Sequence, residues 1–329
     1  MHALSIDDIF SIQNQEQFNQ IALKVFNYQA EYNLIYKKYL FHLGTLNSQI
    51  NTVKDIPFLP IEFFKTQEIK TGTKETVKTF FSSGTTGYER SKHHITDISI
   101  YEKSFISGFE AQYGNITNYC VLALLPTYLE NESSSLVYMV NHLIKLSNHS
   151  ESGFYLHNTD ELAFKLKMLD KTNTKILLIG VSYALIDLLE NFPMNLSNTI
   201  IMETGGMKGK RKEMTKKELH SFLSSKSGVK NIHSEYGMTE LLSQAYSSSD
   251  GKFICPPWMK VLIRDTYDPF YILSDGKSGG INIIDLANIN SCSFIETKDI
   301  GKIHPDNSFE VLGRFDYSDI RGCNLLVAE

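Results

Sequence analysis

The sequence predicts an α/β fold built on a mostly parallel β-sheet with helices on both faces. Short and largely apolar runs occur at 120–125, 175–179 and 199–202, and the first two are followed by segments with apolar residues at helical spacing. Runs of this kind are typical of strands that are buried on both faces. Strands that alternate with helices require the crossover connections of a parallel sheet, so these runs predict the core of the domain.

The segments around these strands are predicted to be helical. Residues 9–43 carry apolar positions at helical spacing, and Pro57 and Pro60 then interrupt the chain. A second helix is expected from Ser133, because serines that can cap a helix precede a run of regularly spaced apolar residues. A third is expected between Gly180 and Pro193. These helices would cover the predicted sheet.

The sequence changes character after Asp250, where short apolar runs alternate with Gly and Asp turns. This pattern predicts a smaller β-rich unit with strands at 260–264, 270–273, 280–284 and 309–311. We therefore divide the chain into an α/β core (1–250), a β-rich subdomain (251–313) and a hinge remnant with a C-terminal tail (314–329).

Composition argues against several functions. The 32 basic and 37 acidic side chains are spread along the 329 residues and give a net charge of −5, so no basic surface for nucleic acid is expected. The four cysteines form no C-x-x-C pair, which argues against a zinc site or a disulfide framework. The first residues do not resemble a signal peptide and no apolar run is long enough for a membrane span, so a cytoplasmic location is predicted.

The segment Phe80-Phe-Ser-Ser-Gly-Thr-Thr-Gly87 combines hydroxyls with glycines. Such a loop can surround a phosphate with backbone amides and hydroxyls, although the spacing of a Walker loop is absent here and at 205–210. Taken alone, it could equally be the polar tip of a hairpin. The candidate phosphate-binding residues are Ser82, Ser83, Gly84, Thr85, Thr86 and Gly87.

The segment Ser234-Glu-Tyr-Gly-Met-Thr-Glu240 places an aromatic ring, a hydroxyl and a carboxylate within one short stretch. Tyr236 could stack on adenine, Thr239 could hydrogen-bond a phosphate, and Glu240 could hold Mg²⁺, which prefers carboxylate oxygen beside phosphate oxygen. A capped helix start is the alternative explanation for this segment.

These two motifs, in this order, resemble the acyl-adenylate-forming enzymes. Residues 82–87 resemble the phosphate loop of that superfamily, and residues 236–240 its Tyr-Gly-x-Thr-Glu motif. The pair Gly205-Gly206 is similar to its glycine pair beside adenine. The resemblance implies ATP and Mg²⁺ as cofactors, Thr239 and Glu240 as catalytic residues, and Glu235, Tyr236 and Gly237 among the nucleotide-binding residues.

Two later segments extend the resemblance. Residues 297–301 resemble the segment whose aspartate, here Asp299, binds the ribose hydroxyls. Residues 313–316 resemble the hinge motif, in which the arginine, here Arg314, contacts ribose and phosphate and the residue at Asp316 is the pivot. The implied fold is the N-terminal large domain of adenylate-forming enzymes, with two sheet-and-helix subdomains and a small β-rich unit, and the nucleotide at their junction.

The reaction of that superfamily joins a carboxylate to the α-phosphate of ATP, so negative charge develops between anionic reactants. Glu240 with Mg²⁺, the 82–87 loop and Arg314 would offset this charge. The basic run Lys92-His93-His94 lies just beyond the loop and could assist, but a solvated basic patch is the more ordinary interpretation.

The chain ends soon after the hinge motif, so it is expected to lack the mobile C-terminal domain that carries a lysine in full-length relatives. By analogy with oxyanion-hole deletions, losing one such donor would cost about 10²- to 10³-fold in rate. This truncation, with segments 124–130 and 318–326, resembles the acyl-protein synthetases of bacterial bioluminescence-type fatty-acid reductases. That family carries its acyl group on a cysteine near the C-terminus, a place that Cys323 matches. The resemblance implies a fatty acid as substrate and an acyl reductase, or another acyl-accepting protein, as partner.

Three other functions remain open. Gly180-Val-Ser182 could form a nucleophile elbow, with Asp299 and His304 as partners by chain order alone. Coenzyme A or a carrier protein could accept the acyl group in place of Cys323. The chain could also be a catalytically weak scaffold subunit that binds nucleotide or acyl chain.

Overall fold

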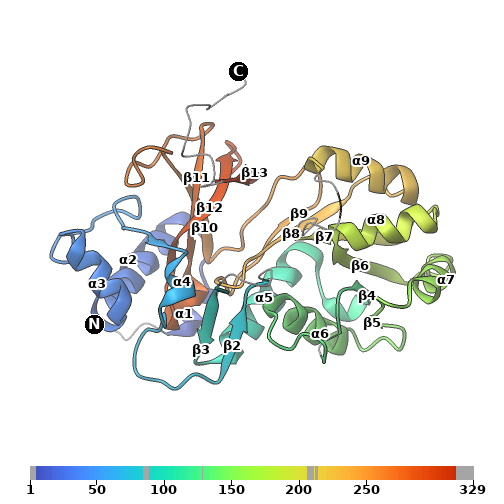
Figure 1. Cartoon of the computed structure of the whole chain (residues 1–329), viewed down its shortest axis with the longest axis horizontal. Coiled ribbons are helices and arrows are strands. Elements are labelled where there is room, and N and C mark those ends of the chain that lie inside the picture. Colours follow the sequence, from blue (N-terminus) through green and yellow to red (C-terminus); the bar gives the residue numbers. More distant parts are fainter. Residues whose placement is uncertain (1–4, 84–88, 128, 206–210, 212–213, 316–329) are drawn as a thin grey trace.

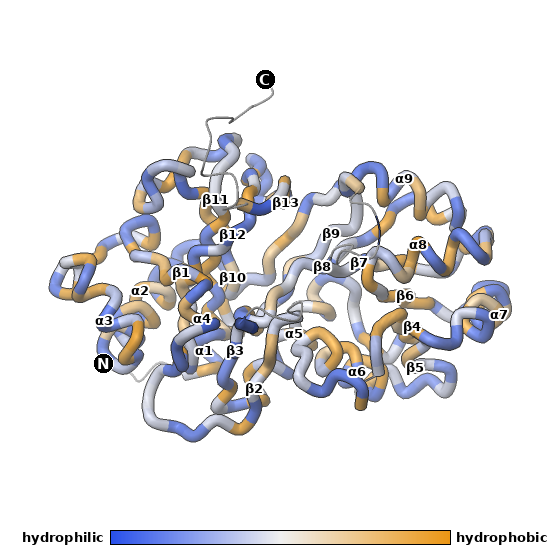
Figure 2. Tube along the Cα trace, in the orientation of Figure 1, coloured by the Kyte–Doolittle hydropathy of each residue, from blue (hydrophilic) through white to orange (hydrophobic). Residues whose placement is uncertain are grey.

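A computed structural model describes residues 5–83, 89–127, 129–205, 211 and 214–315. Figure 1 shows two lobes, each centred on a β-sheet, with a small two-stranded ribbon between them. Their buried residues form one continuous hydrophobic cluster. Figure 2 shows that apolar residues are concentrated in central strands such as β4 and β6, whereas the outer helices alternate between apolar and polar residues.

The six-stranded sheet of one lobe confirms the predicted α/β core. Its strand order is β5-β4-β6-β7-β8-β9, with parallel pairing throughout except for the last strand. The bounds are β4 Tyr119–Leu124, β5 Gly153–Phe154, β6 Lys175–Val181, β7 Thr199–Thr204, β8 His233–Tyr236 and β9 Ala245–Ser247. The three predicted strands correspond to β4, β6 and β7, whose side chains are nearly all buried.

Five helices belong to this lobe: α5 Ile98–Tyr113, α6 Ser135–Ser147, α7 Thr159–Leu169, α8 Ser182–Asn191 and α9 Lys216–Ser227. Helices α8 and α9 lie on one face of the sheet, and α5 and α6 on the other (Figure 1). The predicted serine cap is present, since the Ser134 hydroxyl accepts a hydrogen bond from the Val137 amide at the start of α6. A short 3₁₀ helix, η1 Ile116–Asn118, precedes β4.

The second sheet contains the β-rich part of the chain. Its strands are β10 Met259–Arg264, β11 Ser278–Asp285, β12 Phe294–Ile303, β13 Phe309–Arg314 and β1 Leu59–Pro60, and β12 pairs with β1, β11 and β13. The prediction of a strand at 270–273 is wrong, because only Ile272 forms an isolated bridge. Asp265 and Asp268 accept hydrogen bonds from nearby backbone amides and turn the chain there, which leaves Phe270 and Tyr271 exposed.

The N-terminal helical segment consists of α1 Ile6–Phe10, α2 Gln15–Tyr32 and α3 Leu34–His42. Asn33 separates the last two because its side chain caps α3. These helices pack against the second sheet: the Gln29 amide donates to the Asn288 carbonyl at 3.0 Å, and the Asn33 amide donates to the Ser291 carbonyl at 2.7 Å. The division at residues 250 and 313 stays a prediction, but the N-terminal helices belong spatially to the β-rich lobe.

The ribbon between the lobes is formed by β2 Lys78–Phe81 and β3 Lys92–Ile95. It carries the 82–91 loop, of which residues 84–88 are outside the described part of the chain. A short helix, α4 Phe63–Thr66, and the 3₁₀ helix η2 Leu286–Asn290 lie near the ribbon and the second sheet. None of the helices in the described ranges is long and apolar enough to cross a membrane.

Candidate functional site

The carboxyl ends of β7 and β8 bring two of the predicted motifs together. Thr204 and Glu235 are register partners in the parallel pair, so Gly205 and Tyr236 follow them on neighbouring strands. Gly205 has a φ of 65°, a conformation that glycine adopts without steric cost. A Cβ on Gly237 would lie 2.4 Å from a Glu235 carboxylate oxygen, so a larger residue there would displace the Glu235 side chain. We call this edge of the sheet, at Gly205 and Gly237, the glycine edge.

Tyr236, Asp299 and Arg314 are directly connected. The Tyr236 hydroxyl donates to Asp299 Oδ2 at 2.8 Å, and Arg314 Nε lies 3.1 Å from Asp299 Oδ1. Asp299 and Arg314 are register partners on β12 and β13, which explains why residues fifteen positions apart in sequence meet. Burial raises the pKa of Asp299 although Tyr236 and Arg314 act in the opposite direction. The Arg314 side chain is 69% exposed and can therefore reach a ligand.

Glu240 lies at the base of the 82–91 loop. Its carboxylate is hydrogen-bonded to Ser91, and its backbone carbonyl accepts a hydrogen bond from the Asn288 amide at 2.8 Å. Ser91 in turn pairs with Ser82 through a backbone hydrogen bond of 3.0 Å and a second bond from its amide to the Ser82 hydroxyl at 2.9 Å. Burial raises the pKa of Glu240, and the charges of Arg314 and Asp299 also act on it. The described ends of the loop therefore adjoin the predicted catalytic carboxylate.

Thr239 is held through its backbone by His93 on β3, whose Nδ1 lies 2.8 Å from the Thr239 carbonyl oxygen. The imidazole is fully buried and packs edge-on against Phe64. Burial lowers the pKa of His93 to about 4, so the ring is neutral at neutral pH. The basic run at 92–94 is thus not a solvated patch throughout, because its central residue is a core residue.

Two buried carboxylates on adjacent strands lie behind the glycine edge. Glu235 accepts a short hydrogen bond from the Thr204 hydroxyl, and burial with the nearby Glu203 charge raises the pKa of Glu235 to about 7. Burial alone would also raise the pKa of Glu203, but His220 and Lys216, whose Nζ lies 2.6 Å away, outweigh it and lower that pKa to about 2. Glu235 is therefore close to half protonated at neutral pH, whereas Glu203 is ionised.

Asp285 of β11 joins the segment after Glu240 to the second sheet. Its carboxylate accepts the amides of Leu242 at 3.0 Å and Ser243 at 2.9 Å, and it also accepts the Ser243 hydroxyl at 2.6 Å. Trp258 donates its indole N–H to the same hydroxyl at 3.0 Å. Burial raises the pKa of Asp285 to about 6, and these donors act against that rise. This buried network fixes the Thr239–Glu240 segment from behind.

The structure describes only part of the predicted site. Ser82, Ser83, Gly205, Glu235, Tyr236, Gly237, Thr239, Glu240, Asp299 and Arg314 lie in the described ranges, and the contacts above connect most of them. Outside these ranges are Gly84, Thr85, Thr86, Gly87, Gly206, Asp316 and Cys323. Three supporting residues were not predicted, namely Ser91, Asn288 and Asp285, because their partners are far away in the sequence and they belong to no local motif.

The donors present fit a magnesium ion bound with a nucleotide. Mg²⁺ is usually held by one or two carboxylates together with substrate phosphates, and Glu240 supplies one carboxylate beside the loop ends. Among the described residues, no group of three or more His, Cys, Asp or Glu side chains is arranged to hold a metal by itself. Glu240 is accordingly the residue that could contribute a metal ligand here.

The residues of the alternative serine mechanism have other partners. The Ser182 side chain is buried, and its hydroxyl lies 2.9 Å from the Gly205 carbonyl and 3.2 Å from Glu203. Asp299 pairs with Arg314, and His304 lies 3.4 Å from Glu310 on the second sheet. Ser182 therefore contributes to the packing behind the glycine edge.

The described cysteines are poor nucleophiles. Burial raises the pKa of Cys120 to about 11 and those of Cys255 and Cys292 to about 12. Because the thiolate is the reactive form, these three thiols are unreactive near neutral pH.

Solved structures with a similar fold are adenylate-forming ligases. An ATP-bound RpMatB-BxBclM chimera aligns over 74% of this chain and 48% of its own with a TM-score of 0.56 and 16% identity. ATP-bound MatB from Rhodopseudomonas palustris aligns over 74% and 49% with a TM-score of 0.54 and 16% identity. An open form of 2-hydroxyisobutyryl-CoA ligase with 2-HIB-AMP and CoA aligns over 92% and 70% with a TM-score of 0.67 and 12% identity. The fold is that of the N-terminal domain of these enzymes, and the chain spans about half the length of the first two.

The family comparison covers nearly the whole sequence. None of the curated proteins compared is a significant match. Residues 4–329 match the family described as acyl-protein synthetase, LuxE. The fold, the order of the motifs and this match agree, and the chain belongs to the LuxE acyl-protein synthetase family.

Proposed function

We propose that this protein activates a carboxylic acid with ATP and Mg²⁺ as an acyl-adenylate and then passes the acyl group to Cys323 and on to an acyl reductase. The proposal rests on one observation. Glu240 adjoins the ends of the 82–91 loop, and the charges of Asp299 and Arg314 act on the pKa of the Glu240 carboxylate. Membership of an acyl-protein synthetase family supports an ATP-dependent acid ligase.

The nucleotide is proposed to lie along the glycine edge. Tyr236 would stack on adenine, with Gly205 and Gly206 beside it, and Asp299 would accept the ribose hydroxyls. Arg314 would contact ribose and phosphate, and the loop Ser82–Gly87 would bind the phosphates. The existing Tyr236–Asp299–Arg314 contacts support this pose, because they orient the carboxylate before a ribose binds.

In the first step, a carboxylate oxygen of the acid forms a bond to the α-phosphorus of ATP. The bond from that phosphorus to the bridging oxygen breaks, and pyrophosphate leaves with the electron pair. Mg²⁺ at Glu240 would supply charge neutralisation at the phosphates. The backbone of Thr239 and Glu240, which His93 and Asn288 hold, would keep these side chains oriented toward the phosphates.

In the second step, the Cys323 thiol loses its proton to solvent and its thiolate attacks the acyl carbon of the adenylate. AMP leaves with the bonding electrons, and the acyl group becomes a thioester that an acyl reductase can accept. The raised pKa values of Cys120, Cys255 and Cys292 support this choice, because those thiols are protonated at neutral pH.

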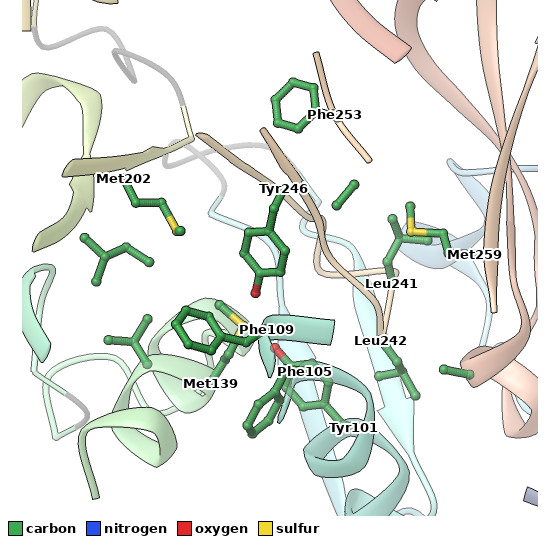
Figure 3. Close-up of a cluster of buried hydrophobic side chains, with 14 of the residues drawn as sticks. Tyr101, Phe105, Phe109, Met139, Met202, Leu241, Leu242, Tyr246, Phe253 and Met259 are labelled. Atoms are coloured by element: carbon green, nitrogen blue, oxygen red, sulfur yellow. The ribbon is translucent and has the colours of Figure 1, made fainter. Parts of the chain in front are cut away.

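A long-chain fatty acid is the proposed substrate. The apolar strands that could favour such a chain, 122–125 and 176–179, are fully packed core. Figure 3 shows another cluster of buried hydrophobic side chains, in which the Tyr246 hydroxyl points toward Phe109. That hydroxyl is buried without a hydrogen-bond partner among the described residues. Each methylene that a bound fatty acid buries contributes about 0.8 kcal/mol, so affinity would increase with chain length.

Two alternative functions differ from this proposal in the acyl acceptor or in the lack of efficient catalysis. Coenzyme A or a carrier protein would accept the acyl group if Cys323 does not. A scaffold subunit would bind ATP or AMP without releasing pyrophosphate. The cytoplasmic location and the reductase partner stay predictions.

The intact mass of the purified chain tests the proposal after incubation with ATP, Mg²⁺ and a panel of carboxylic acids. We expect a mass increase equal to one acyl group, which hydroxylamine removes and which Cys323→Ala abolishes. Cys255→Ala is the matched control, because the raised pKa of its thiol keeps it protonated at neutral pH, and the variant should acylate like the native chain.

Acylation of Cys323→Ala at the native rate would contradict the role of this cysteine. Acid-dependent pyrophosphate release without any acyl-protein would favour a separate acceptor, and nucleotide binding without release would favour the scaffold.

A further inference from the structure

The hydrogen bond between His93 and the Thr239 carbonyl fixes the tautomer of the imidazole. A carbonyl oxygen can only accept, so Nδ1, 2.8 Å away, must carry the proton. In a neutral ring the other nitrogen, Nε2, is then an acceptor. Nε2 is buried and has no hydrogen-bond partner among the described residues. An unpaired acceptor in the interior costs about 1–3 kcal/mol, so a partner for it is expected.

Two further unpaired atoms belong to residues that line a cavity together with His93. A cavity of about 10 Å³ is lined by residues that include His93, Thr96 and Ser291. The hydroxyl oxygens of Thr96 and Ser291 are also buried without a partner among the described residues, so three of the eight such atoms belong to residues lining this one cavity. The space accommodates one water and no larger ligand, and a buried water makes two to four hydrogen bonds.

A single water in this cavity would satisfy all three groups. It donates one hydrogen to His93 Nε2 and the other to one hydroxyl, and it accepts a hydrogen bond from the second hydroxyl. The cavity lies where three parts of the fold meet, because Thr96 follows β3, Leu242 follows the Glu240 segment, and Ser291 follows η2. Ser291 is itself anchored, since its carbonyl accepts hydrogen bonds from Asn33 and Thr71.

We propose that His93 is a positioning residue for adenylation: a buried water shared with Thr96 and Ser291 holds the ring so that its Nδ1–H fixes the Thr239 carbonyl and orients Thr239 and Glu240. The inference rests on the proposed function, because it assigns this orientation to the adenylation step. It gives a role to a histidine that does not contact substrate and that the basic run at 92–94 did not single out.

Substitutions at position 93 separate the two ring nitrogens. In His93→Asn the amide nitrogen can take the place of Nδ1 as donor to Thr239, whereas His93→Gln reaches the place of Nε2 and leaves the carbonyl unpaired. We expect His93→Gln to lower kcat for acid-dependent ATP–pyrophosphate exchange by about tenfold or more with KM for ATP little changed, the size expected for one buried hydrogen bond. His93→Asn should retain kcat within about threefold.

His42→Asn is the control, since this histidine is exposed at the end of α3 and does not line the cavity. Thermal unfolding of each variant identifies a loss of fold. Equal kcat values for His93→Asn and His93→Gln, with both folded, would overturn the proposal.

A second measurement does not depend on activity. The ¹⁵N spectrum of histidine-labelled protein should show His93 with a protonated Nδ1 and an unprotonated Nε2, and Thr96→Val or Ser291→Ala should shift the Nε2 resonance. A protonated Nε2 would overturn the inference even in an active enzyme. Conversely, absence of exchange in the native chain with the expected tautomer would refute the adenylation role while leaving the water site intact.

Discussion

Asp299 connects three elements through one carboxylate, because it accepts the Tyr236 hydroxyl from β8 and pairs with Arg314 from β13. The sequence predicted these residues from the resemblance of their motifs, and the structure brings them into contact. It could not predict Ser91 or Asn288, whose contacts with Glu240 arise only when β3 and η2 pack against the segment after β8. At the scale of single residues, the motifs predicted the proposed ligand-binding residues, whereas the residues that support them follow only from tertiary packing.

The variant Asp299→Asn distinguishes the proposed role of this carboxyl in ATP binding from its effect on the stability of the fold. Burial raises the pKa of Asp299, so ionising this carboxyl is costly in the folded state, and the amide removes that cost. We expect the Tm of the variant to equal or exceed that of the native chain, while ATP binding by calorimetry weakens by about tenfold or more because the ribose acceptor is changed. Asp160→Asn, at an exposed position on α7, should change neither. Native ATP affinity in Asp299→Asn would remove Asp299 from the nucleotide site.

The adjacent strands β7 and β8 carry Glu203 and Glu235, whose pKa shifts have opposite signs. The raised pKa of Glu235, about 7, means that its stabilising contribution is present below its unfolded value and is lost as pH rises through 7. The lowered pKa of Glu203, about 2, means that its contribution is present above the unfolded value and is lost only as pH falls toward 2. Each pKa shift corresponds to a change in the free energy of unfolding on the order of 3 kcal/mol.

Glu235→Gln should therefore raise the free energy of unfolding at pH 8 but change it little at pH 5. Glu203→Gln should lower it at both pH values, because the ion pair with Lys216 is lost. Urea unfolding at the two pH values measures both effects. A change in the free energy of unfolding with the same sign for both variants at pH 8 would contradict the opposite pKa shifts of the two carboxylates.

Arg264, the last residue of β10, helps to position β12, because it donates to the Thr297 carbonyl at 2.7 Å, two residues before Asp299. A Cβ on Gly280 would lie 2.4 Å from the Arg264 guanidinium carbon. Gly280→Ala should displace the arginine and lower the free energy of unfolding by about 1–3 kcal/mol, and it should also weaken ATP binding. Gly313→Ala has open space for its methyl group and is the control. Equal free energies of unfolding for Gly280→Ala and Gly313→Ala would show that the Arg264 side chain does not need the space at Gly280.

Sequence patterns were most informative for elements buried on both faces. The strands β4 and β6 were predicted because nearly every side chain in them is apolar, and β7 was predicted from the apolar run at 200–202. The strand β12 was not recognised, because its burial alternates and its middle was interpreted as a site motif. The N-terminal helices were predicted as one segment, since the Asn33 cap that divides α2 from α3 gives a weaker signal than the apolar periodicity.

At the scale of the whole molecule, Asp285 joins the two lobes by accepting the amides of Leu242 and Ser243. The only tryptophan, Trp258, donates to the Ser243 hydroxyl and therefore reports on this junction. Asp285→Ala leaves these donors unpaired and should lower the urea midpoint substantially, with Trp258 fluorescence changing before far-UV circular dichroism. Asp275→Ala, in the exposed turn before β11, should behave like the native chain. Coincident transitions at the native midpoint would contradict a structural role for this junction.

The junction of the two lobes is proposed to activate a carboxylic acid. Acid-dependent exchange of labelled pyrophosphate into ATP tests this activity most directly, with fatty acids of graded chain length and with Glu240→Gln as the variant. We expect exchange that requires both the acid and Mg²⁺, increases with chain length, and falls by about 10²-fold or more in Glu240→Gln. Exchange that is absent with every acid, or that persists unchanged in Glu240→Gln, would contradict it.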